Sequence, residues 1–442
     1  MKEDTPGADP GTRSAVLGAG VLGLTVGLRL LERGEGVTVY EQHPLPGGLA
    51  AGFEIEPGLW LEKFYHHLFR SDRHVIRLIQ QLGLGGRLEW KRPLTVTLSG
   101  GIAHQLDSAG SLLRFRPLPV VDRLRLALGL AALKALPSGR LLEGRGAADW
   151  IRGVMGRRAY EVVWGPLLKG KFGDLAEQIS LPWFWGRVHD RSAQLGYVRG
   201  GFQLFYNALA GRVRELGGDL CFSTSVTGVK AAAGKLSVTS QPAAGGGSAS
   251  ATFDRVISTL PTRLTCRLAP ELPAAYRERH DWGLAFGAHC VILALDRPLT
   301  GAYWTNVNDS AVPFMVLVEH TNYMPAAAYG GRHLVYLGNY RPMDDPLFIA
   351  SQEEVLKAFL PALAHVAPGF EASWVRRAWM FKAPFAQPIV TRDYAAHIPG
   401  FDTPLPGLFV ANMFQVYPHD RGQNYSVELA ERLIEHLART AR

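Results

Sequence analysis

Cysteine is scarce in this chain of 442 residues, which contains only Cys221, Cys266 and Cys290. The three lie far apart in the sequence, with neither the short spacings of a zinc site nor the regular pattern of a disulfide framework. We therefore expect no metal site and a reducing compartment, which we take to be the cytoplasm.

The chain also lacks an apolar run long enough to cross a membrane. In the strongly apolar segment 124–136, Arg125 and Lys134 bracket the most apolar part and Pro137 follows it. A membrane span needs about 20 apolar residues. We interpret this segment as a core helix, and the alternative is an interfacial helix that makes a peripheral membrane contact.

A dense basic run is missing too, although the net charge is +8. The excess comes from scattered arginines, so nucleic-acid binding is not indicated, and any attraction to anionic substrates or lipid surfaces is unspecific. Residues 1–13 are charged and rich in proline and glycine, which predicts a disordered tail without a signal peptide. The composition, 47% apolar and 19% charged, is that of a globular chain with room for two domains.

What the chain does contain is a glycine motif between two apolar strands. The strand at 15–17 runs into Gly18, Gly20 and Gly23, a helical pattern follows, and the next strand ends at Glu41, 23 residues after Gly18. Such glycines allow a tight turn, close approach of a pyrophosphate and close helix packing, and the carboxylate accepts hydrogen bonds from a ribose. The combination predicts a Rossmann-like dinucleotide-binding domain.

A second glycine pair, Gly47-Gly48, follows Glu41. In this feature the chain resembles the FAD-dependent flavoproteins of the amine oxidase, protoporphyrinogen oxidase and phytoene desaturase superfamily. The next residue in that superfamily is often arginine or lysine, whereas here it is Leu49. The resemblance implies a non-covalently bound FAD.

The C-terminal segment also resembles this superfamily. An apolar strand at 407–413 is followed by a loop and by a helix that begins near Tyr425. In the superfamily this helix directs its N-terminus at the flavin, where its partial positive charge stabilises the reduced ring.

The resemblance is clear over 14–70, 197–262 and 382–437, and it implies the following contacts. The cofactor-binding residues expected are Gly18, Ala19, Gly20, Val21, Leu22, Gly23, Glu41, Gln42, Gly47, Gly48, Leu49, His66, Val226, Asn412, Asn424, Tyr425 and Ser426.

Between these segments the cofactor domain is interrupted twice. Helical patterns fill much of 71–196, among them 148–169, whereas short apolar runs from 287 to 340 indicate strands. We expect an α/β fold in which 14–70, 197–275 and 401–442 bind FAD. A mixed α+β substrate domain is expected from 71–196 and 276–400.

The segment 62–69 carries the densest chemistry, with adjacent His66 and His67. In the superfamily this segment lies against the flavin, and it also resembles the histidine loop of UDP-galactopyranose mutase, in which His67 best matches the flavin-side histidine. Two neighbouring histidines cannot readily ligate one metal ion. Lys382 is a further candidate, because amine oxidases place a lysine near flavin N5, although a surface lysine is the alternative.

Three functions follow from the resemblance. The first is a FAD-dependent oxidoreductase that takes a hydride from a C–N or C–C bond of a small molecule and passes electrons to oxygen or another acceptor. The second is a sugar-nucleotide mutase without net redox change, against which stands the lack of an evident arginine pair for a diphosphate in the substrate segments. The third is a non-catalytic protein with a flavin fold.

Overall fold

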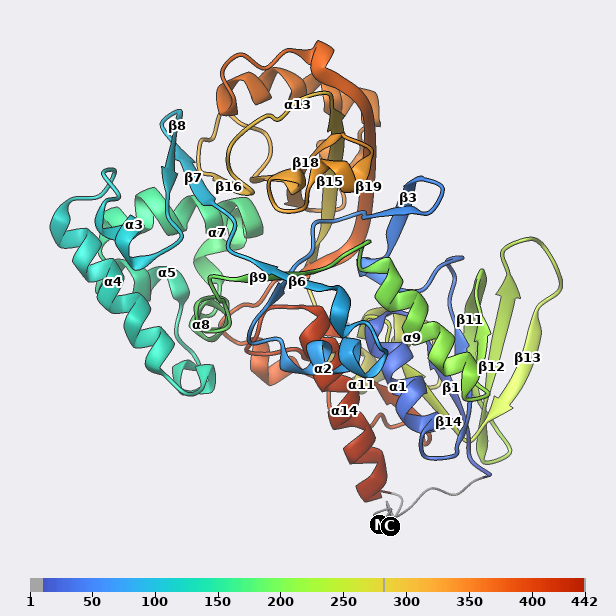
Figure 1. Ribbon diagram of the computed structural model, residues 1–442. Helices are drawn as coiled ribbons and strands as arrows, with labels where there is room; N and C mark the ends of the chain where they lie inside the picture. Colours follow the sequence, from blue (N-terminus) through green and yellow to red (C-terminus); the bar gives the residue numbers. More distant parts are fainter. Residues whose placement is uncertain (1–10, 281–282, 441–442) are drawn as a thin grey trace.

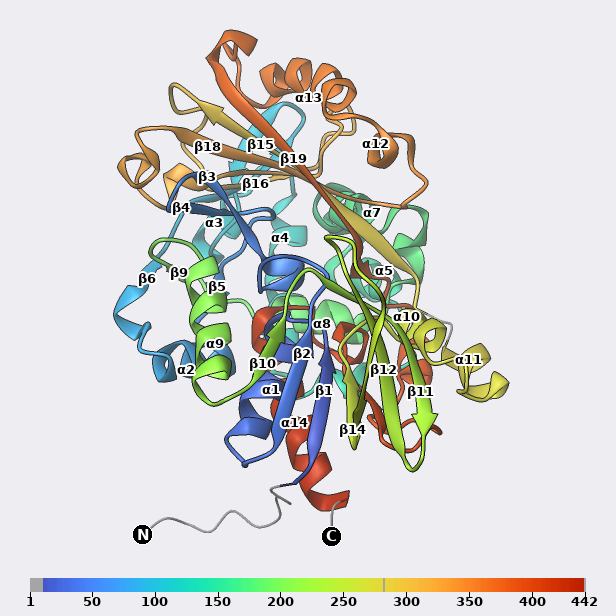
Figure 2. The same cartoon turned by 90° about the vertical axis from the view of Figure 1, so that its right-hand side faces the viewer.

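The computed structural model describes residues 11–280 and 283–440. Most of the tail expected at 1–13 lies outside these residues, and Arg13 already begins the first strand. The described chain forms a lower part built on a parallel sheet and an upper part built on a largely antiparallel sheet, with a group of helices beside them (Figures 1 and 2).

The parallel sheet brings together strands from three distant parts of the sequence. Its order is β10 (Asp219–Cys221), β2 (Gly36–Tyr40), β1 (Arg13–Leu17), β14 (Arg255–Ser258) and β20 (Leu408–Val410). Every strand is short and rich in apolar residues, as expected when both faces of a sheet are covered.

Both faces of this sheet are covered, and the alternation of side chains along β1 explains how. Val16 points to the face where α1 (Val21–Leu31) packs between α9 (Gln203–Glu215) and α14 (Gln423–Thr440). Ala15 and Leu17 point to the other face, which is covered by a three-stranded antiparallel sheet. Its strands are β11 (Thr224–Ala232), β12 (Lys235–Pro242) and β13 (Ala249–Phe253).

The seven-stranded sheet of the upper part has two different faces. Its order is β19 (Val375–Pro388), β15 (Ala285–Leu295), β18 (His333–Arg341), β17 (Val316–Glu319), β16 (Trp304–Val307), β7 (Thr95–Ser99) and β8 (Ile102–Gln105). Val291 and Leu293 of β15 pack against α13 (Gln352–Val366), whereas Cys290 and Ile292 join the large core shared with the parallel-sheet part. The upper sheet therefore turns one face toward the part built on the parallel sheet (Figure 2).

The remaining described strands and several short helices complete these two parts. They are β3 (Gly52–Glu56) with β4 (Leu59–Glu62), β5 (Leu68–Phe69) with β9 (Leu195–Val198) and β6 (Leu88–Lys91), and the helices α2 (Arg73–Gln81), α10 (Thr262–Leu268), α11 (Ala274–His280) and α12 (Pro346–Ile349).

The helical group differs from the sequence prediction at 148–169. In place of one helix there are α5 (Ala147–Trp150), a π-helix (Ile151–Met155), α6 (Arg157–Ala159), a second π-helix (Tyr160–Trp164) and α7 (Gly165–Phe172). Gly156 has φ of 104°, which an α-helix does not accommodate, and it separates the first π-helix from α6. The group is completed by α3 (Ala109–Leu113), α4 (Val120–Ala135) and α8 (Leu181–His189), and the Ser180 side chain caps the start of α8.

The apolar helix α4 is a core helix on one side only. Leu126 and Leu133 are buried, whereas Val121 and Leu128 are 67% and 71% exposed. None of the helices in the described part of the chain combines the length and apolar character that crossing a membrane requires.

Candidate flavin site

The turn between β1 and α1 is built around its glycines. Gly18 has φ of 105°, in the region that favours glycine, and a Cβ on Gly23 would lie 2.0 Å from the Gly18 carbonyl oxygen. At Gly20, by contrast, a Cβ would meet nothing closer than the Gly48 Cα at 4.0 Å. No side chain caps α1 at Gly20, so its first-turn N–H groups face an open cradle.

The second glycine pair forms the other wall of this cradle. The Gly47 N–H donates to the Ala19 carbonyl at 2.9 Å, and Gly20 and Gly47 form an isolated β-bridge. Gly47 and Gly48 have φ of 118° and 57°, and a Cβ on Gly48 would lie 3.2 Å from the Gly20 Cα. The structure thus brings together two glycine motifs that are separate in the sequence.

Glu41 lies at the same end of the sheet. Its Oε2 accepts a hydrogen bond from the Ala19 N–H at 2.8 Å, and its Oε1 accepts one from the His43 N–H at 2.9 Å. The carboxylate is nearly buried, yet each oxygen keeps a lone pair for a further donor.

A pocket opens beyond the cradle, between Leu49 and the upper sheet. Its other lining residues come from the segment 64–66, from β15, β18 and β19, and from the loop before α14; among them are Tyr65, His66, Tyr340 and Arg421. Leu49, which lines this pocket, is 44% exposed.

The two histidines occupy different positions. His66 lines the pocket, with its Nδ1 2.6 Å from the Phe64 carbonyl oxygen, and burial lowers its pKa to about 4. His67 is not among the lining residues; its Nδ1 lies 3.2 Å from the Tyr303 hydroxyl, and burial, followed by Arg191, lowers its pKa to about 3. Both imidazoles are therefore neutral at pH 7, and the structure puts His66, not His67, at the pocket wall.

Lys382 lies away from the pocket. Its Nζ donates to the carbonyls of Ile349 and Ala350 at 3.1 and 2.6 Å. It pairs in register with His289, which contributes to the pocket lining while its ring packs against Phe359. The neighbouring Ala383 faces the pocket instead. Lys382 is therefore not among the residues that line this pocket.

The side chains expected to bind the cofactor from the C-terminal segment are engaged within the protein. Asn412 Oδ1 accepts from the Phe414 N–H at 3.1 Å, Asn424 Oδ1 accepts from the His74 N–H at 2.9 Å, and Ser426 donates to the Gly422 carbonyl at 3.1 Å. Tyr425 stacks on His419. The backbone N–H groups of Asn412 and Ser426 are engaged as well, with the Gln415 side chain at 2.7 Å and the Gly422 carbonyl at 3.1 Å.

Two further expected residues are at the edge of the site. Val226 lies in β11 at a break in its register with β12, where a backbone group is freed from the ladder. Gln42 is exposed beside His43 at the end of β2.

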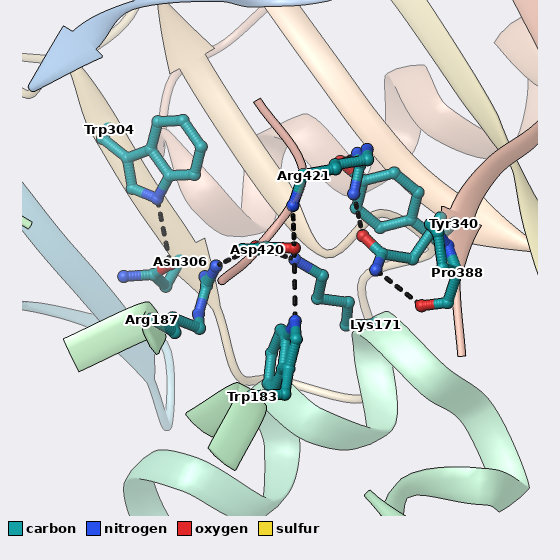
Figure 3. A network of polar contacts seen from close by, with 10 residues as sticks. Lys171, Trp183, Arg187, Trp304, Asn306, Tyr340, Pro388, Asp420 and Arg421 are labelled. Atoms are coloured by element: carbon teal, nitrogen blue, oxygen red, sulfur yellow. Dashed lines mark hydrogen bonds and ion pairs between the residues drawn. The ribbon is translucent and has the colours of Figure 1, made fainter. Parts of the chain in front are cut away.

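A polar network centred on Asp420 lies next to the pocket (Figure 3), and little in the sequence indicates it. Asp420 Oδ2 accepts from Lys171 Nζ at 2.9 Å and from Arg187 Nη1 at 3.5 Å, and its Oδ1 accepts from the Trp183 indole N–H at 3.2 Å. Although burial alone would raise the pKa of Asp420, Lys171, Arg421 and Arg187 lower it, so the carboxyl group is ionised.

Arg421 connects this network to the pocket. It donates to the Tyr340 hydroxyl at 2.6 Å and also to the Gln387 side chain (Figure 3). Two features of the sequence point toward this network. Asp420 and Arg421 lie in the loop before α14, and Trp183 and Arg187 lie in a segment rich in aromatic residues.

Known proteins resemble this chain in sequence and in fold. The zeta-carotene desaturase of Zea mays is 28% identical over 180 residues, which cover 36% of this chain and 32% of that protein, so the chain matches about a third of the length of this relative. An oxidoreductase from Methanosarcina mazei has a TM-score of 0.74 at 19% identity, with 96% of this chain and 100% of that chain covered.

Reduced UDP-galactopyranose mutase has the same fold, with a TM-score of 0.75 at 15% identity, and 96% of this chain and 95% of that chain covered. The family model of the flavin-containing amine oxidoreductases matches residues 23–419. Because this match takes in nearly the whole described chain, the protein belongs to the family of flavin-containing amine oxidoreductases.

Proposed function

We propose that this protein is a FAD-dependent oxidoreductase that removes a hydride from a C–N or C–C bond of a small organic substrate. The observation that carries the proposal is the cradle in which Gly20, Gly48 and the first turn of α1 meet, with Glu41 beside it and the pocket beyond. FAD supplies a two-electron acceptor at N5 when it is bound.

The open space at Gly20 and the free N–H groups of α1 suit a pyrophosphate. Gly20 leaves room for close approach, and the uncapped N-terminus of α1 offers N–H groups and a partial positive charge. Glu41 keeps free lone pairs for a ribose. The isoalloxazine would then extend to Leu49 and His66.

The pocket residues would orient the substrate and exclude water. Ala288, Ala383 and Ala386 give one wall an apolar surface, while Tyr65 and Tyr340 offer hydroxyl groups. His66 is neutral and its Nδ1 is held by the Phe64 carbonyl, so its Nε2 remains for the ring or the substrate.

The cysteine in the pocket lining is poorly suited to form a covalent bond to the flavin, which supports non-covalent binding of FAD. Cys290 lines it, but burial raises the pKa of this thiol, and a buried thiol is a poor nucleophile. The three cysteines are all free, which supports the reducing, cytoplasmic setting that we propose.

The experiment is anaerobic mixing of the purified, yellow protein with candidate amines, cyclic imines, porphyrinogens and polyenes. Bleaching of the flavin by one of these classes, and release of FAD rather than FMN on denaturation, are the expected results. A colourless protein that binds NAD would overturn the proposal.

One observation favours a second function, a flavin-dependent sugar-nucleotide mutase. The substrate segments contain no evident arginine pair, but Arg187 from one of them and Arg421 from the C-terminal segment both interact with Asp420. Turnover of a sugar nucleotide only after reduction with dithionite, with no bleaching by the first set of compounds, would decide for the mutase.

A further inference from the structure

Four cationic side chains gather around one carboxylate beside the pocket. Lys171 and Arg187 form ion pairs with Asp420 at 2.9 and 3.5 Å, and Arg191 and Arg421 also interact with it electrostatically. We refer to Lys171, Arg187, Arg191 and Arg421 as the cation cluster. Lys171 lies in α7 and Arg187 in α8, whereas Arg191 lies in the segment after α8 and Arg421 in the loop before α14.

The cluster carries positive charge in excess. Asp190, which precedes Arg191 in the sequence, is already held by His419 at 2.8 Å and by His189 at 3.2 Å. Even if Asp190 is counted with Asp420, four cations face two carboxylates. An uncompensated buried charge is costly, so a bound anion would stabilise this arrangement.

The pKa values of two cluster members are lowered, in part by the neighbouring positive charges. Burial lowers the pKa of Lys171, and Arg187 and Arg421 lower it further against the opposing effect of Asp420. Burial and then Arg187 lower the pKa of Arg191 to about 9. A nearby anion would favour the charged form of both groups.

Arg191 is the member that is most available to a ligand. Its side chain is exposed, and Arg187 is close enough to lower its pKa. In the described part of the chain no carboxylate lies within ion-pair distance of its guanidinium, and the Phe69 ring is 6.0 Å away.

The cluster adjoins the pocket wall. Arg421 lines the pocket, and the Lys171 ammonium lies 5.6 Å from the centre of the Tyr340 ring. Arg187 and Arg191 both lower the pKa of His67, next to the pocket residue His66. A group bound by the cluster would therefore be part of a molecule whose other end occupies the pocket.

We infer that the cation cluster binds a phosphate or diphosphate group of the substrate and excludes protonated amines. A phosphate ester carries close to two negative charges at neutral pH, which matches the excess, whereas a single carboxylate would leave part of it uncompensated. Guanidinium groups also bind phosphate oxygens through paired hydrogen bonds. The inference rests on the proposed function, because it names the substrate class for the same site.

The test uses the flavin-loaded full-length chain and inorganic pyrophosphate as the probe. At constant ionic strength, pyrophosphate should bind saturably by calorimetry and produce a flavin difference spectrum. Arg187→Gln and Arg191→Gln should each weaken binding about tenfold or more, the scale of lost charge-assisted hydrogen bonds. Arg187→Lys should retain part of the affinity.

Arg212→Gln is the matched control, because Arg212 is an exposed arginine of α9 paired with Glu215. It should bind pyrophosphate like the wild type. Should Arg187→Gln fail to fold, Arg191→Gln still gives the answer, since loss of Arg191 breaks no ion pair within the described residues. Equal affinity in Arg191→Gln and Arg212→Gln, or no saturable binding by the wild type, would overturn the inference.

Two further readouts separate the possible failures. The FAD content of each variant is measured first; a loss of FAD in Arg191→Gln would show that the cluster serves the cofactor, which also overturns the inference. A wild type without flavin defeats the proposed function. Calorimetry with pyrophosphate then still tests the cluster through the difference between Arg191→Gln and Arg212→Gln, because binding in the empty glycine cradle would be the same in both variants. Rapid bleaching by a protonated amine, unaffected by pyrophosphate, would contradict the exclusion of amines.

Discussion

The Ala19 N–H donates a hydrogen bond to the Glu41 carboxylate, with nitrogen and Oε2 2.8 Å apart, and so joins the glycine turn to the end of β2. The Glu41 carboxylate is thereby fixed at the edge of the cradle before any ligand arrives. If it holds the ribose of FAD, Glu41→Ala should weaken FAD binding by about 1–3 kcal/mol, the range for lost hydrogen bonds to a charged group.

A fluorescence titration of the apoprotein with FAD measures this effect. Circular dichroism at saturating FAD should show the wild-type fold. An unchanged dissociation constant would mean that Glu41 only organises the turn.

The glycines of α1 offer a matched pair of substitutions. In Gly23→Ala the new Cβ would lie 2.0 Å from the Gly18 carbonyl, a backbone group that cannot move without opening the turn. In Gly27→Ala the nearest atom is Val39 Cγ2 at 3.4 Å. We expect Gly23→Ala to be purified without flavin, whereas Gly27→Ala retains it and keeps its stability to within about 1 kcal/mol.

Flavin content per chain and thermal melting provide the measurements. Flavin retention by Gly23→Ala at the wild-type level would show that the turn relaxes, and the importance of this close contact would then be disproved.

The local motifs could be predicted from the sequence because their physics is local. Gly18, Gly23 and Glu41 lie within one strand–helix–strand unit, so their spacing alone defines the turn and the strand end. The approach of Gly48 to Gly20 followed from resemblance, and the structure supplies its geometry.

Lys382 and the cation cluster could not be predicted in this way. Successive residues of a strand face opposite sides of a sheet, so the register of β19 decides that Ala383, not Lys382, faces the pocket. Lys171 and Asp420 are 249 residues apart in the sequence, and only the packing of α7 against the loop before α14 makes them an ion pair.

The two sides of α4 should differ sharply in their contribution to stability. Leu126 is 1% exposed, so Leu126→Ala should cost about 2–4 kcal/mol through lost burial and the cavity that it leaves. Leu128 is 71% exposed, so Leu128→Ala should change the free energy of unfolding by less than about 0.5 kcal/mol.

Urea titrations of the two variants beside the wild type provide the comparison. A large loss of stability in Leu128→Ala would indicate that another surface covers this side of α4 in solution.

His320 should make the stability depend on pH. Burial, followed by Lys91, lowers its pKa to about 3, whereas the unfolded chain takes up this proton near pH 6.5. The unfolded state therefore binds more protons below about pH 6.5, and stability falls as the pH falls. His320→Gln should lose about 2 kcal/mol less than the wild type between pH 7 and pH 5.

Tyr329→Phe is the control, because it removes the hydroxyl that lies 2.6 Å from His320 Nε2 and leaves the imidazole in place. It should be less stable than the wild type at every pH but show the same slope. Parallel slopes for His320→Gln and the wild type would exclude His320 as the titrating group.

The last prediction concerns the different positions of His66 and His67. His66 lines the pocket, whereas His67 lies behind it with its ring near those of Phe69 and Trp304. His66→Ala should therefore shift the flavin absorbance bands more than His67→Ala, while both variants bind close to one FAD per chain. Because the pKa values of the two imidazoles are about 4 and 3, neither should produce a break in the pH–rate profile between pH 6 and 8.

In an oxidoreductase, His66→Ala should also slow reduction of the flavin by the substrate, while photoreduction proceeds as in the wild type. In a mutase, the oxidised enzyme is not reduced by a sugar nucleotide, and the variant should slow only the turnover that follows chemical reduction. A larger spectral shift in His67→Ala would mean that the ring lies deeper than the pocket wall, so His67 would regain the position beside the flavin that its sequence motif predicts.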